Sequence, residues 1–127
     1  MAGRPEYRIV LVERPAWLHA VATGDNVAEN ARRFLREAYE ACVSRGRDCL
    51  LLEMSFSGES LPTATIFEIV TERSADGARL RRIAYVDRRL GHDPAKALFA
   101  ETVAVNRAVN VRLFHDVADA ERWLAQP

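Results

Sequence analysis

The chain has 127 residues, 49% of them hydrophobic, which is enough for one domain that buries roughly two-thirds of its unfolded surface. Lysine plus arginine equals aspartate plus glutamate at 18 each, so no overall basic field exists to attract nucleic acid. The apolar runs are short, and Arg4, Glu6 and Arg8 interrupt the amino terminus, which argues against a membrane-spanning helix and a signal peptide. We expect one cytoplasmic domain over residues 1–127, with its core at about residues 6–125.

The first elements of the chain are predicted to be two strands. Residues 7–13 and 17–23 are rich in β-branched and aromatic side chains, and Pro15 lies in the short break between them. A break of this length indicates a tight turn. We therefore expect an antiparallel pair.

A helix is predicted after this pair. Asn26 and Glu29 have the spacing of a capping box at a helix start. Apolar residues then recur at helical intervals at Val27, Ala31, Phe34, Leu35, Ala38, Tyr39 and Cys42. Gly46 is placed to end the helix in the left-handed conformation. Cys42 and Cys49 are expected to be reduced, buried thiols, because two cysteines without a secretion signal do not indicate a disulfide framework.

The central element of the fold is predicted at residues 49–54. Leu50, Leu51 and Leu52 follow one another, so in a strand they point to alternate faces of the sheet, and both faces must be covered. This pattern is typical of a central parallel strand. Open α/β sheets bind ligands at the carboxyl ends of their strands, so we expect the functional site near the loop that follows, at residues 55–60.

The remaining elements alternate between helix and strand. A helix opening at Leu61 and Pro62 is expected to end by Ser74, with Asp76 and Gly77 forming a turn. The other expected elements are a strand at 82–87, a helix from Pro94 towards Ala108 capped by Asp93, a strand at 111–115, and a terminal helix capped by Asp116 that places Val117, Ala120, Trp123 and Leu124 on one face.

The predicted order β-β-α-β-α-β-α-β-α gives the fold class. Such alternation indicates an α/β domain with a mixed sheet of about five strands and four helices, in which right-handed crossovers join parallel strands. If the helices lie mainly on one face, the apolar strands need a second cover. Either a homodimer or the terminal helix could supply it.

This arrangement resembles the STAS fold of anti-sigma-factor antagonists, and specifically the SpoIIAA-like group that is described together with Sec14-type lipid-binding domains. The segments that carry the resemblance are the paired strands 7–13 and 17–23, the strand 49–54 with its small-residue loop, the strand 82–87, and the ending 111–114 with 120–124. The resemblance covers nearly the whole chain. It implies a STAS-like regulatory or ligand-binding module rather than an enzyme, with no cofactor.

The loop before the second predicted helix departs from the motif of the phosphorylatable antagonists. Those proteins carry Asp-Ser-Ser-Gly at this place, whereas residues 55–60 read Ser-Phe-Ser-Gly-Glu-Ser. A phosphate on Ser57 or Ser60 would meet the positive end of the following helix, although Glu59 would oppose it. The simpler interpretation is that Ser60 caps the helix and that Ser57 and Gly58 turn the chain.

Two chemical sites can also be considered at the same edge of the sheet. The polar residues in the strand-to-helix loops are Asp25, Asn26, Ser57, Ser60, Asp87 to His92, His115 and Asp116. A serine, a histidine and an aspartate from this set would suit a small hydrolase, but no Gly-x-Ser-x-Gly elbow is present. The spacing of the histidines does not fix three zinc ligands, so we predict no metal site.

The arginines around the strand at 82–87 are a further local feature. They are Arg79, Arg81, Arg82, Arg88 and Arg89. Arginines that flank a buried strand are usually solvated side chains at the ends of the strand. Arg88 and Arg89 follow the carboxyl end of the strand, where they could hold an acidic ligand or partner.

Two functional hypotheses follow. In the first, the module contacts a protein partner, or a second copy of itself, through Ser57, Gly58, Ser60 and Leu61. In the second, as the resemblance to Sec14-type domains implies, a small apolar ligand lies between the sheet and the second predicted helix. The residues expected to contact such a ligand are Phe56, Ile66 and Phe67, with Arg88 and Arg89 as contacts for an acidic one.

Overall fold

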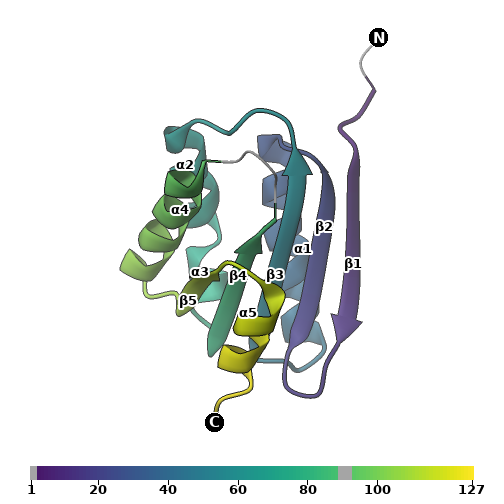
Figure 1. Ribbon diagram of the computed structural model, residues 1–127, viewed down its shortest axis with the longest axis vertical. Coiled ribbons are helices and arrows are strands. Elements are labelled where there is room, and N and C mark those ends of the chain that lie inside the picture. The colour runs from purple at the N-terminus through teal and green to yellow at the C-terminus, as the bar shows by residue number, and fades with distance from the viewer. Residues whose placement is uncertain (1–2, 89–92) are drawn as a thin grey trace.

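The computed structural model describes residues 3–88 and 93–127. A five-stranded sheet in the order β1-β2-β3-β4-β5 forms its centre (Figure 1). The strands are β1 (Tyr7–Glu13), β2 (Leu18–Asp25), β3 (Cys49–Ser57), β4 (Arg82–Asp87) and β5 (Val111–Phe114). The helices are α1 (Ala28–Ser44), α2 (Thr63–Glu72), α3 (Ser74–Gly77), α4 (Pro94–Asn106) and α5 (Val117–Leu124).

The strand directions agree with the sequence prediction. β1 pairs with β2 antiparallel, and the other neighbours in the sheet are parallel. Each parallel crossover moves one strand further in the same direction, so right-handed crossovers place α1, α2 and α4 on one face of the sheet. α5 lies on the opposite face, in front of the sheet in Figure 1.

The central position of β3 is confirmed. Leu50, Leu51 and Leu52 have exposed fractions of 0%, 0% and 4%. Leu50 and Leu52 belong to the larger core, together with Phe34 from α1. Leu51 points the other way and packs in a smaller core with Ala84, Val86, Ala120 and Leu124. The apolar run is therefore buried on both faces, as the absence of polar alternation predicts.

The terminal helix provides the second cover for the sheet. Its buried residues, Ala120 and Leu124, pack on β3 and β4, with Trp123 against Phe114 at a ring distance of 5.5 Å. The sequence allowed either a homodimer or the terminal helix to cover this face of the sheet. The structure shows that α5 covers it within the chain. None of the helices in the described ranges combines the length and apolar character needed to cross a lipid bilayer.

Several predicted helix ends are confirmed. Asp93 accepts a hydrogen bond from the backbone of Ala95, and Asp116 accepts one from Asp119, so both cap their helices. Gly46 follows α1 with a φ of 68°, in the left-handed region that favours glycine.

The prediction of a capping box at the start of α1 is wrong. The N-cap residue is Val27, and no side chain caps the helix. Asn26 instead donates from its side-chain amide to the carbonyl of Glu59 at 2.6 Å, which ties the end of β2 to the loop after β3. The buried residue Asn30, in the first turn of α1, fixes the start of the helix. Its side-chain amide donates to the carbonyls of Glu6 and Asp25, both at 2.8 Å. Tertiary hydrogen bonds thus replace the local cap.

The structure also differs from the turn that was predicted at Asp76 and Gly77. These residues form the end of the short helix α3, so five helices are described where four were expected. Gly77 is buried, and a side chain there would approach Val109 and the hydroxyl of Tyr39. The helical turn therefore packs closely against these two residues.

Both cysteines are buried and free. Burial raises the pKa of the Cys42 thiol from 9.0 to about 11, with smaller contributions from Cys49 and Asp48. Because the reactive species is the thiolate, a pKa two units higher lowers its population roughly a hundredfold below pH 9.

We therefore expect iodoacetamide at pH 8 to alkylate Cys42 at least about a hundredfold more slowly in the folded protein than in urea. Peptide mass spectrometry over time measures this rate. Equal rates in the two conditions would contradict the burial of the thiol.

Candidate functional site

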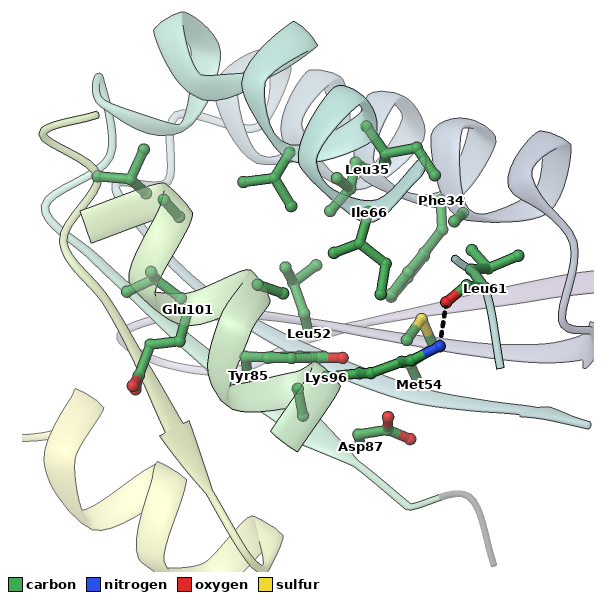
Figure 2. Close-up of a pocket in the computed structure, with 18 of the residues that line it drawn as sticks. Phe34, Leu35, Leu52, Met54, Leu61, Ile66, Tyr85, Asp87, Lys96 and Glu101 are labelled. Carbon is green, nitrogen blue, oxygen red and sulfur yellow. Dashed lines mark hydrogen bonds between the residues drawn. The ribbon is translucent and has the colours of Figure 1, made fainter. Parts of the chain in front are cut away.

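A cavity lies between one face of the sheet and helices α1, α2 and α4 (Figure 2). Its volume is about 150 Å³, and most of its wall is apolar. The apolar wall consists mainly of Phe34, Leu35, Leu52, Met54, Leu61, Ile66, Ile69, Val70, Tyr85, Val109 and Val111. A cavity of this size accommodates a body about as large as a benzene ring.

Small side chains on α4 create the space. The helix presents Ala97, Ala100 and Ala104 to the cavity, while Leu98 and Val105 on its other side are 54% and 51% exposed. Alanines fill little of the volume between a helix and a sheet. The cavity is therefore a consequence of which face of α4 is turned inward.

One end of the cavity is polar. Lys96, in the first turn of α4, donates from Nζ to the carbonyl oxygen of Leu61 at 2.6 Å (Figure 2). Tyr85 and Asp87, from the end of β4, lie beside the lysine in the same view. Glu101 also lines the cavity, but its carboxylate points away and accepts a hydrogen bond from the backbone of Leu113. An ammonium group and an apolar wall thus meet at the carboxyl edge of the sheet.

The loop after β3 is shorter than predicted. β3 continues through Ser57, because residues 55–57 pair with residues 23–25 of β2. Gly58, with a φ of 121°, then turns the chain. α2 begins at Thr63 rather than at Leu61, and its N-cap is Pro62, with no side-chain cap. The prediction that Ser60 caps the helix is therefore wrong.

The predicted loop residues lie at different places. Ser60 and Leu61 line the cavity. Ser57 is exposed at the end of β3, where its hydroxyl donates to the carbonyl of Gly24 at 3.4 Å. Asp25 is its partner in the strand register. A phosphate on Ser57 would thus lie near a carboxylate-bearing residue and well before the start of α2, which weakens the physical argument for it.

The predicted ligand contacts are also dispersed. Ile66 lines the cavity. Phe56 is 1% exposed and lies in the core, with the rings of Tyr7 and Phe34 each 6.3 Å away. Phe67 is 43% exposed on the outside of α2, with the guanidinium of Arg107 over its ring. The described cavity wall contains neither phenylalanine.

The arginines near β4 are engaged in structural contacts. Arg81 pairs with Asp48 at 3.4 Å, and Arg82 donates to the carbonyls of Trp123 and Gln126 near the end of α5. Arg88 pairs with Glu53 on the face of the sheet opposite the cavity. Arg89 and His92 lie outside the described residues.

A cluster of His19, Glu53 and Arg88 occupies that opposite face. His19 Nε2 lies 2.7 Å from Glu53 Oε1, and the Arg88 guanidinium is 3.6 Å from the other oxygen. The partner of His19 was not predicted from the sequence. The available signal was Glu53, the one charged residue in the apolar run of residues 49–54.

His115 and Asp116 lie between β5 and α5. His115 is exposed after β5, and Asp116 is occupied as the cap of α5. Within residues 3–88 and 93–127, no three side chains of histidine, cysteine, aspartate or glutamate gather in a way that could hold a metal ion.

Sequence reasoning also missed the contribution of α4 to the cavity, since it placed the ligand against the second predicted helix. The signal was present as alanines at positions 97, 100 and 104, which recur at helical spacing. Only the orientation of the helix shows that they face the sheet.

No known protein family and no curated protein matches the sequence. Among the solved structures that match, two are similar to this chain along almost their whole length. One is an uncharacterized protein from the DUF3478 family with a SpoIIAA-like fold, from Shewanella loihica, at 11% identity and a TM-score of 0.60, with 98% of each chain covered. The chain has the SpoIIAA-like fold.

The second structure supports the same assignment. It is an anti-sigma factor antagonist from Mycobacterium paratuberculosis, at 13% identity and a TM-score of 0.64, covering 99% of this chain and 100% of the other. The STAS-like resemblance predicted from the sequence is thereby confirmed at the level of the SpoIIAA-like fold. The mixed α/β sheet is confirmed with it, and the helix count is five instead of four.

Proposed function

We propose that this protein is a non-catalytic binding module in which the apolar body of a small ligand occupies the cavity between the sheet, α2 and α4. The observation that carries the proposal is the composition of the cavity wall: apolar side chains along its length, with polar groups at one end. Ligand pockets typically combine an apolar lining with a few placed polar groups. A regulatory role fits the SpoIIAA-like fold, which this chain shares with an anti-sigma factor antagonist.

The loop between β3 and α2 connects the cavity to the surface. Ser60 and Leu61 line the cavity, whereas Gly58, Glu59 and Pro62 are exposed. A ligand that touches Leu61 can therefore alter the surface of this loop. We propose that the loop is where a protein partner senses the ligand.

Filling the cavity tests the proposal. We expect Ala100→Phe to weaken binding of 3-phenylpropanol at least about tenfold, because the new ring takes the space of the ligand. Chemical-shift changes in NMR titrations measure the affinity. The matched control is Ala95→Phe, which adds the same ring to an exposed position of the same helix. Thermal unfolding verifies that both variants are folded.

Two outcomes would reject the proposal. Wild-type protein that shows no saturable binding would remove the ligand function. Equal affinity of the Ala100→Phe and Ala95→Phe variants would place the ligand elsewhere.

A second candidate function is direct contact with a protein partner through Ser57, Gly58, Ser60 and Leu61, without a ligand. The specific support is again the fold shared with an anti-sigma factor antagonist, together with the exposure of Ser57 and Gly58. A partner retained equally by wild-type protein and by the Ala100→Phe variant would favour this alternative.

A further inference from the structure

We infer that the ligand of the cavity is a small amphipathic acid, whose carboxylate binds Lys96 and whose aromatic or aliphatic body fills the apolar part. The inference rests on the proposed function, since it specifies the class of ligand. Its basis is the charge arrangement at the polar end of the cavity.

Lys96 is placed where a helix does not favour a cation. It is the third residue of α4, and its side chain lies near the positive end of the helix dipole. It is also half-buried, so its ammonium group has lost part of its hydration. Both effects disfavour a lysine here unless an anion compensates them.

The protein supplies only partial compensation. The described hydrogen bond of Lys96 goes to a neutral carbonyl, that of Leu61. Asp93 and Glu101 also line the cavity, but each accepts a hydrogen bond from a backbone N–H. Among the described residues, no carboxylate lies within ion-pair distance of Lys96.

The carboxylate of Asp87 would repel an acidic ligand electrostatically. It lines the same end of the cavity, and it is already engaged in an interaction of its own. Lys96 has three N–H donors, of which the Leu61 carbonyl takes one. A ligand carboxylate can therefore bind Lys96 without breaking the contact between α4 and the loop. A hydrogen bond between an ammonium and a carboxylate, in which both groups are charged, is stronger than one from the ammonium to a neutral carbonyl.

The cavity volume sets the size of the body. At about 150 Å³ it accommodates a phenyl ring, with a short linker to reach the lysine at the polar end. A long acyl chain or a sterol exceeds this volume. The ligand class is therefore an arylalkanoic or short-chain aliphatic acid.

Three probes with one body and different head groups test the inference: 3-phenylpropanoate, 3-phenylpropanol and 3-phenylpropylamine. We expect wild-type protein at pH 7 to bind the acid at least about tenfold more tightly than the alcohol, and the amine most weakly. Lys96→Met is expected to remove the preference for the acid while leaving the affinity for the alcohol within about threefold. Lys96→Arg, which retains the charge, is expected to keep the preference.

The possible results separate the inference from the proposed function. If none of the three probes binds wild-type protein, the proposed function itself fails. If the alcohol or the amine binds as tightly as the acid, or if the Lys96→Met variant retains the preference, the cavity still binds ligands but the acidic class is wrong. Thermal unfolding shows whether each variant is folded.

Discussion

Replacing Phe56 by alanine is expected to lower the free energy of unfolding by about 3–5 kcal/mol. The side chain is 1% exposed, and its ring lies between those of Tyr7 and Phe34. Removal of the ring leaves a cavity between β1, β3 and α1 that these rigid elements cannot close. Urea unfolding followed by circular dichroism measures the change.

Phe67→Ala is the matched control, since the same atoms are removed from a side chain that is 43% exposed. Its expected cost is below about 1 kcal/mol, including the contact with Arg107. A similar cost at the two positions would contradict the assignment of Phe56 to the core. Such a result would reopen Phe56 as a residue available to a ligand.

Replacing Gly24 by alanine is expected to cost about 2–5 kcal/mol, because two penalties act together. The residue has a φ of 137°, which L side chains rarely adopt. A β-carbon here would also collide with the carbonyl of Glu6 and lie 2.9 Å from the α-carbon of Tyr7. Glu6 cannot move freely, because its carbonyl accepts hydrogen bonds from Asp25 and Asn30.

Gly46→Ala separates these two penalties. Gly46 also has a positive φ, 68°, but no atom lies within 4 Å of an added β-carbon. We expect a cost of about 1 kcal/mol from the backbone conformation alone. If urea unfolding gave the same loss for both variants, the close approach of β1 to Gly24 would not be the cause.

The fold was predictable because its main signals are local and repeated. Leu50 to Leu52 without polar alternation required a strand covered on both faces, and the apolar spacing from Phe34 to Cys42 required a helix. Asp93 and Asp116 confirm that a short polar side chain before an apolar run marks a helix start. These features depend on neighbours a few residues apart.

The errors arose where distant segments decide the conformation. Ser55 and Ser57 are small and polar, which is typical of a loop, yet pairing with β2 keeps residues 55–57 extended. Asn26 has the spacing of a cap, but the carbonyl of Glu59 takes its amide. Neither partner could be identified before the chain was folded.

The cavity was only partly predictable. A ligand site between the sheet and the helix after β3 was implied by the resemblance to Sec14-type domains, and Ile66, one of the expected contacts, lines the cavity found there. Its volume depends on the alanines of α4 facing the sheet, and its polar end depends on Lys96 reaching Leu61 across 35 positions of sequence. The spacing of apolar residues predicts which face of a helix or strand is buried, but it does not predict the volume left between two packed elements.

The position of α5 affects how the protein forms during synthesis. The strands that it covers, β3 and β4, are complete by Asp87, whereas α5 begins only at Val117. A growing chain therefore holds Leu51, Ala84 and Val86 without their cover until the helix has left the ribosome. During that interval the uncovered apolar face is a surface through which nascent chains can self-associate.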